Sequence, residues 1–115
     1  MAMLGTHSGD PVSLPAKLAT PMALLFHELA TNACKYGAFS AGAGVLQVSW
    51  NIEKNARDLK IVWDEAGGPT LKSGTKEGFG LKLINSVLSS FNGKADLQFL
   101  ETGLHCTIKC KIPEA

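Results

Sequence analysis

The sequence lacks a strong charge of either sign and a long apolar run. Eleven Lys and Arg residues stand against ten Asp and Glu residues, so the net charge is +1. A dedicated nucleic-acid module normally carries a basic excess, which argues against that class of protein. No apolar stretch approaches the roughly 20 residues of a membrane span, and no signal peptide is recognisable at the N-terminus. We therefore expect a cytoplasmic domain that contacts neither nucleic acid nor membrane.

Cysteine is also scarce, with only Cys34, Cys106 and Cys110 in the chain. Cys106 and Cys110 are four residues apart in an alternating stretch, where a strand would separate their alpha carbons by about 13 Å. A disulfide tolerates at most about 7 Å between alpha carbons. We interpret the pair as small core residues of a protein from a reducing compartment.

The 115 residues predict one domain, and 45% hydrophobic with 18% charged residues exclude a disordered chain. Residues 1–10 carry no pattern and are interpreted as a tail or a cloning remnant, which leaves a domain at residues 11–115. Strands are expected at residues 11–14, 46–52, 59–63, 97–99 and 104–112, a second helix at 79–91, and a long loop at 66–78. The order predicts an α+β fold, a two-layer α/β sandwich whose helices cover one face of a mostly antiparallel sheet.

The main helix is predicted between residues 16 and 36. Thr20 as N-cap and Pro21 after it predict where the regular helix begins, and Gly37 predicts its end. Six residues fall within a sector narrower than about 100° and predict one buried stripe. They are Leu18, Met22, Leu25, Leu29, Ala33 and Tyr36.

The first candidate motif lies on this helix. Glu28, Asn32 and Lys35 stand at positions i, i+4 and i+7, beside the predicted stripe. An amide oxygen is a hard ligand suited to magnesium, and a lysine ammonium is a point charge suited to phosphate oxygens. A solvated helix face explains the same spacing equally well. His27 precedes Glu28, but Thr31 occupies the place where a zinc protease needs its second His.

Two further motifs end a strand and begin a helix. In Trp63-Asp64-Glu65-Ala66-Gly67-Gly68-Pro69, a carboxylate can accept a hydrogen bond from an adenine amine, and the glycines let the backbone pass close to a ligand. A strand-ending turn is the plainer interpretation. Gly78-Phe79-Gly80-Leu81 precedes helical spacing and is typical of an anion site at a helix N-terminus. Alone, this last signal is weak.

Together the three motifs resemble the N box and the two glycine boxes of the GHKL (Bergerat) ATP-binding fold of gyrase, MutL and sensor histidine kinases. The N-box residues correspond to Asn32, Lys35 and Tyr36. The first glycine box has Glu65 in place of Asp and Pro69 in place of the last Gly. These departures are similar to the HWE histidine kinases, which are named for a His in the N box, here His27, and a Trp-x-Glu, here Trp63 to Glu65. The resemblance extends over residues 11–113.

The resemblance implies a protein-histidine kinase catalytic domain that binds Mg-ATP. Its γ-phosphoryl group would pass to a histidine on a separate phosphoacceptor domain and indirectly to a response regulator. Asn32 would hold magnesium, and Glu28 would orient or activate the acceptor histidine, with His27 a candidate without a firm role. The other residues implied in nucleotide binding are Lys35, Tyr36, Glu65, Gly67, Gly78, Gly80 and Leu81.

Two alternatives stay open at this point. One is a GHKL ATPase clamp or serine kinase, against which Glu65 counts because those families typically have Asp in the first glycine box. The other is a non-catalytic scaffold that has lost nucleotide binding, against which the intact Asn32, Lys35, Gly78 and Gly80 count.

Overall fold

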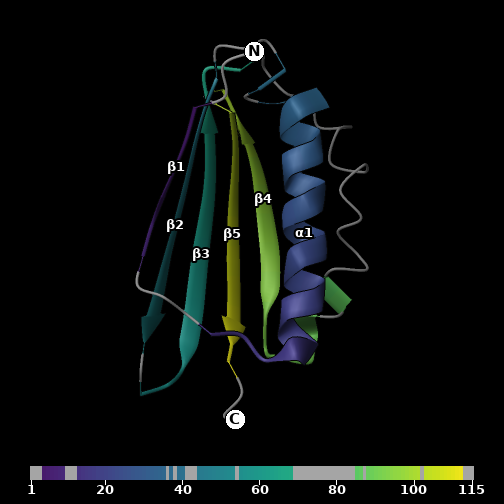
Figure 1. The fold of residues 1–115 in the computed structure, drawn as a ribbon, viewed down its shortest axis with the longest axis vertical. Helices are drawn as coiled ribbons and strands as arrows, with labels where there is room; N and C mark the ends of the chain where they lie inside the picture. Colours follow the sequence, from purple (N-terminus) through teal and green to yellow (C-terminus); the bar gives the residue numbers. More distant parts are fainter. Residues whose placement is uncertain are drawn as a thin grey trace.

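The computed structural model describes residues 4–9, 13–35, 37, 39–40, 44–53, 55–68, 85–86, 88–101 and 103–112. One long helix, α1, runs alongside a sheet of five strands (Figure 1). The elements in chain order are β1 (Leu4–Ser8), α1 (Ala16–Lys35), β2 (Val45–Glu53), β3 (Asp58–Ala66), β4 (Lys94–Leu100) and β5 (Gly103–Lys111). This arrangement confirms the predicted α+β architecture.

The strand order across the sheet is β1-β2-β3-β5-β4. All neighbouring strands are antiparallel except β1, which runs parallel to β2. The two predicted hairpins, β2–β3 and β4–β5, are confirmed. Because β5 lies between β3 and β4, the last hairpin packs with its second strand inward, next to the strand that carries the Trp-x-Glu motif.

The predicted stripe of α1 is confirmed at every described position. Leu18, Met22, Leu25, Leu29 and Ala33 are all buried, while Tyr36 lies outside the described residues. On the sheet, the residues that alternate inward on β3, β4 and β5 are buried against them. Cys106 and Cys110 belong to this inward set, and both are free thiols, as their spacing predicts.

The predicted start of the helix at Pro21 is wrong, because α1 begins at Ala16. The carbonyl of Pro15 accepts hydrogen bonds from the backbone N–H groups of Leu18 (3.0 Å) and Ala19 (2.9 Å). Thr20 does not cap, since its hydroxyl bonds to the Ala16 carbonyl one turn earlier. Proline inside a helix removes one backbone donor. The ring of Pro21 is buried, as is Leu18. Their burial against the sheet favours a helix that begins at Ala16 over one that begins at Pro21.

The N-terminal segment also differs from its prediction as a tail. Leu4–Ser8 form β1, which pairs residue by residue with β2, from Leu4 opposite Val45 to Ser8 opposite Ser49. The edge strand was expected at residues 11–14 instead; Ser13 and Leu14 are not in a strand, and residues 11 and 12 lie outside the described part. An edge strand is held by backbone hydrogen bonds to one neighbour. Backbone hydrogen bonds do not require alternating apolar side chains, so the sequence shows no periodic pattern there.

The second predicted helix is described only in part. Residues 85–86 and 88–89 are helical, and Leu88 is fully buried. The chain then turns, with the N–H of Gly93 bonded to the Leu88 carbonyl at 3.0 Å, which confirms the predicted stop at Asn92-Gly93. Of the predicted loop, Ala66 is the last residue of β3, Gly67 and Gly68 are described, and residues 69–78 lie outside the described part. No helix in the described part of the chain is long and apolar enough to cross a membrane.

Candidate functional site

Two polar side chains are buried among the described residues, Asn32 at 6% and Glu65 at 2% exposure. Burying a polar group costs free energy unless it is hydrogen-bonded, and burying a carboxylate costs more. Both are positions for which the sequence predicts a ligand role. The fold therefore places its two costly internal polar groups at two of the predicted site positions.

Glu65 owes its inward direction to the alternation of β3. Leu59, Ile61, Trp63 and Glu65 share the face that meets α1, since residues two apart on a strand point the same way. The indole Nε1–H of Trp63 donates to Oε2 of Glu65 at 2.7 Å. A hydrogen bond to a carboxylate is stronger than one between neutral groups, so the Trp-x-Glu spacing fixes the carboxylate by its own neighbour on the strand.

Asp64 points to the opposite face of the sheet and is exposed. Its Oδ1 lies 3.3 Å from Nδ1 of His105 on β5. Thr107, also on β5, shares that outward face. The alternation thus separates the two adjacent carboxylates into an internal one and a surface one.

Two glycines allow the chain to approach Glu65. A Cβ atom at position 37 would overlap Oε1 of Glu65 and lie 3.1 Å from the Ala33 alpha carbon. A Cβ at position 103 would overlap the Glu65 carbonyl oxygen, and Gly103 has a φ of 142°, which favours glycine. The sequence predicts Gly37 only as the end of the helix. Both contacts arise between distant segments, so no sequence period signals them.

Because Gly37 lies against Glu65, the C-terminal end of α1 packs directly on β3. The N–H of Gly37 donates to the Asn32 carbonyl at 3.0 Å, and the N–H of Phe39 donates to the Ala33 carbonyl at 3.0 Å. These bonds satisfy carbonyls that the helix end would otherwise leave without partners. They confirm that the helix ends just before Gly37, and they hold that end against the Glu65 carboxylate.

Asn32 lies in the next-to-last turn of α1 with its amide orientation set by the helix. Its Nδ2 donates to the Glu28 carbonyl at 2.8 Å, which leaves Oδ1 as the oxygen that a ligand can use. An amide oxygen suits a hard cation such as magnesium, which takes few protein ligands and keeps water and phosphate oxygens as the rest. The residues at this position therefore fit the implied metal.

The other residues of the first motif are more exposed to solvent than Asn32. Glu28 is half-buried, and Lys35, in the last turn of α1, is exposed. With buried Asn32 they form an edge of α1 beside the stripe, as the spacing predicts. His27 is exposed on the same helix.

Gly67 and Gly68 are the glycines of the two glycine boxes that lie within the described residues. Gly67 follows β3 directly, is exposed and has a φ of 78°, a conformation that requires glycine in practice. The remaining predicted contacts, Tyr36, Gly78, Gly80 and Leu81, lie outside the described residues.

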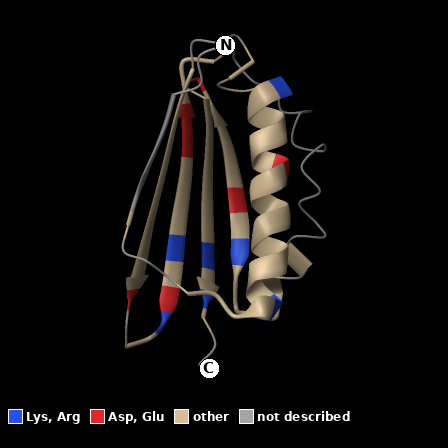
Figure 2. Ribbon diagram, viewed as in Figure 1, with Lys and Arg blue, Asp and Glu red and all other residues tan. Residues whose placement is uncertain are grey.

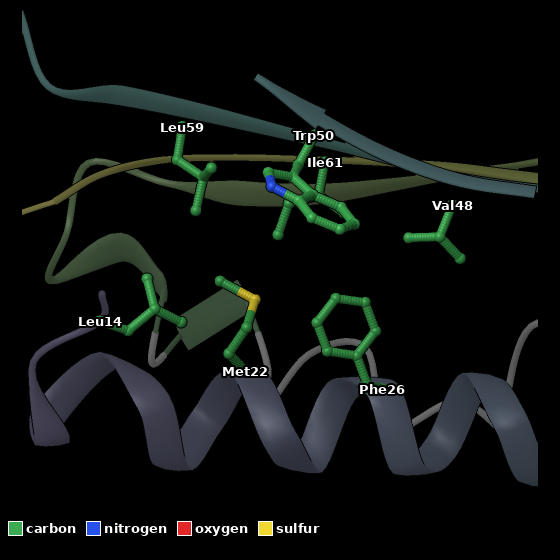
Figure 3. Close-up of a pocket in the computed structure, with 7 residues that line it drawn as sticks. All are labelled: Leu14, Met22, Phe26, Val48, Trp50, Leu59 and Ile61. Atoms are coloured by element: carbon green, nitrogen blue, oxygen red, sulfur yellow. The ribbon is translucent and has the colours of Figure 1, made fainter. Parts of the chain in front are cut away.

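An apolar pocket lies elsewhere, between the first half of α1 and β2 and β3 (Figure 3). Met22 and Phe26 of the helix point toward Val48 and Trp50 of β2 across it. Leu14, Leu59 and Ile61 complete the lining. Since every lining side chain is apolar or indole, this pocket lacks the charged groups that a triphosphate requires.

The two core thiols, Cys106 and Cys110, are inert. Burial, followed by the nearby charges of Asp96 and Glu65, raises the pKa of Cys106 from 9.0 to about 12. Burial also raises the pKa of Cys110. A thiol reacts as its thiolate, so neither residue is a nucleophile near neutral pH.

Known proteins similar to this chain are histidine kinases. The sequence is 40% identical over 106 residues to blue-light-activated histidine kinase 1 of Erythrobacter litoralis, covering 90% of this chain and 29% of that protein. It is 36% identical over 100 residues to the blue-light-activated histidine kinase of Brucella ovis, covering 84% and 20%. The chain thus spans less than a third of the length of these curated relatives. No protein-family model matches the sequence.

Solved structures with the same fold include two histidine kinases. The histidine kinase domain of Erythrobacter litoralis EL346 superimposes with a TM-score of 0.78 at 19% identity, covering 96% of this chain and 52% of that one. The catalytic domain of histidine kinase ThkA gives a TM-score of 0.69 at 14% identity, covering 96% and 78%. The chain is therefore related in sequence to histidine kinases and has the fold of their catalytic domains. The finer HWE assignment stays a prediction.

Proposed function

We propose that this chain binds Mg-ATP and donates its γ-phosphoryl group to a histidine on a separate dimerisation and phosphoacceptor domain, in cytoplasmic two-component signalling. The burial of Asn32 and Glu65 beside the end of α1 supports the proposal most directly. A scaffold has no need of an internal carboxylate and amide at that place, because apolar side chains of similar size would cost less to bury.

Phosphate and metal binding falls to the last turns of α1. Oδ1 of Asn32 would hold magnesium, which neutralises phosphate charge and bridges protein to nucleotide when bound. The exposed ammonium of Lys35 and the backbone N–H groups of Gly80 and Leu81, with Gly78 before them, would hold phosphate oxygens. Tyr36 stays a proposed nucleotide contact through the family resemblance.

Adenine recognition falls to the end of β3. Glu65 would accept a hydrogen bond from the adenine amine, with Gly67 passing close to the ring. The bond from Trp63 to Oε2 fixes the carboxylate before any ligand arrives. A preorganised acceptor loses less conformational entropy on binding than a mobile one.

The acceptor histidine would approach from the exposed side of α1. Glu28, half-buried at that edge, would orient or activate the incoming imidazole as a general base. His27, exposed beside it, is a candidate to support Glu28 or the phosphates. A response regulator would receive the phosphoryl group from the acceptor domain and not from this chain.

Thermal melts with ATP, with magnesium and with both test the binding step. A ligand at 100 times its dissociation constant stabilises the folded state by about 2.7 kcal/mol, on the order of a 10 °C rise for a domain of this size. Asn32→Ala should lose most of a rise that needs both components. Its unliganded midpoint should change little, because Ala favours the helix by roughly the amount that the lost hydrogen bond contributed. Asn51→Ala, at an exposed Asn on β2, is the matched control and should keep the full rise.

Labelled ATP tests the transfer step. The chain alone should not become labelled, whereas a phosphoacceptor domain added in trans should acquire acid-labile label. Nucleotide binding without transfer would favour the ATPase alternative, and no binding would favour the scaffold. Label on His27 would show that this residue is itself the acceptor.

A further inference from the structure

The face of the sheet opposite α1 carries three lysines in one row. Lys60 of β3 pairs in register with Lys109 of β5, and Lys109 pairs with Lys94 of β4. All three are exposed, and their neighbours along each strand are buried on the side of α1. Figure 2 shows the three blue segments side by side on β3, β5 and β4.

This arrangement costs stability. Like charges directly opposite each other on neighbouring strands repel by a few tenths of a kcal/mol to about 1 kcal/mol. Lysines on an edge strand guard against aggregation, but β3 and β5 lie inside the sheet, where that purpose does not apply. Within the described part of the chain, no ion pair joins any of the three ammonium groups to a carboxylate.

The row borders a hollow that is also lined by Thr107 and Asp96. Acidic residues stand on both sides of the row: Asp96 one outward position away on β4, and Asp58 one outward position away on β3, opposite Glu53. Outward positions repeat about every 6.6 Å along a strand, and three strands span about 10 Å across. On β5, Lys111 lies one outward position beyond Lys109 and pairs in register with Asp58. The positive charge therefore extends across the three strands and one position along β5, and acidic residues border it on β3 and β4.

We propose that this row docks an acidic segment of another protein, which presents two or three carboxylates within about 10 Å. Charge complementarity supplies the attraction, and the hydroxyl of Thr107 supplies a donor beside it. A nucleic-acid strand is the poorer occupant, because its continuous phosphates would also meet Asp96, Asp58 and Glu53. Lys60 and Glu65 are five residues apart on β3 and face opposite sides, so this surface is separate from the proposed nucleotide site.

Nuclear magnetic resonance of the ¹⁵N-labelled chain with a hexaglutamate peptide at low salt tests the proposal. The largest amide shifts should centre on residues 60, 94 and 109, and binding should weaken as salt increases. Lys109→Gln should weaken binding about threefold, and Lys60→Gln/Lys94→Gln/Lys109→Gln should remove it, since an exposed charge pair contributes up to about 1 kcal/mol. The matched control is Lys17→Gln, at an exposed position of α1, which has the same charge change and should bind normally.

Each other outcome overturns the proposal. If Lys17→Gln weakened peptide binding equally, net charge alone would explain the binding. Amide shifts centred on α1 would place the peptide contact on the helix. A hexathymidylate that binds the same row as tightly would make it a general polyanion surface. Displacement of the peptide by saturating Mg-ATP would make the row part of nucleotide binding, whereas persistence of the peptide separates this proposal from the proposed function.

Discussion

The indole Nε1 of Trp63 and Oε2 of Glu65 lie 2.7 Å apart between the sheet and α1, and both side chains are buried. Two residues of one strand, separated by a single outward residue, thus form an internal donor–acceptor pair. Because Gly37 and Gly103 approach Glu65 from other segments, the pair also joins the end of α1 to the start of β5. The Trp-x-Glu sequence therefore has a structural role in the fold, in addition to its proposed role in binding.

Replacing Trp63 by Phe should destabilise the protein through loss of the indole donor. Phe keeps an aromatic ring near Phe26, whose ring centroid lies 6.1 Å from that of Trp63. The loss of a hydrogen bond to a buried carboxylate is worth about 1.5–3 kcal/mol, or roughly 7–15 °C in the unfolding midpoint. In a Glu65→Gln background, where the acceptor is neutral, the same change should cost less. Equal losses in both backgrounds would attribute the effect to ring packing.

Gly37→Ala should displace the Glu65 carboxylate, because the added methyl group would overlap Oε1. The midpoint should fall, since the carboxylate leaves its position beside Trp63. Combining the change with Glu65→Asp shortens the acidic side chain by one methylene group and should restore part of the loss. Calorimetric melts of both single variants and the double variant measure this coupling. Strict additivity of the two changes would argue against the contact.

Glu65→Ala and Asp64→Ala should differ sharply in their effect on ATP affinity. The proposed bond between Glu65 and adenine is worth roughly 1.5–3 kcal/mol, so affinity should fall about 10- to 150-fold. Asp64 is exposed on the opposite face beside His105, and its removal should change affinity little. Titration calorimetry below both unfolding midpoints separates binding from stability. A larger loss for Asp64→Ala would transfer the adenine contact to that residue.

Alkaline pH should destabilise the protein through Cys106. Its pKa is raised from 9.0 to about 12, first by burial and then by Asp96 and Glu65. Between these values the unfolded chain loses the thiol proton while the folded chain keeps it, so the free energy of unfolding falls as pH rises. Below the unfolded pKa this contribution is fully present. Denaturant titrations of the parent and of Cys106→Ala from pH 8 to about pH 11 measure the effect, and the variant should show the shallower decline.

Residue periodicity is enough to predict the two layers of the fold. The apolar residues of α1 recur at helical spacing, and those of β2 to β5 alternate, because each element buries one face against the other layer. The same periodicities placed Asn32 at the edge of the stripe and set Glu65 opposite to Asp64. Local turn residues such as Asn92-Gly93 marked where elements end. Each of these features depends on residues only a few positions apart.

Contacts between distant segments follow from the packing of the whole domain and are not predictable from local patterns. β1 was missed because backbone pairing with β2 leaves no pattern in Leu4–Ser8, and α1 continues through Pro21 because its ring packs into a core that the local sequence does not contain. The contacts of Gly37 and Gly103 with Glu65 and the row of Lys60, Lys109 and Lys94 depend on strand order and register. Those are set by the packing of the whole domain, since shifting a strand by one residue reverses every side chain on it.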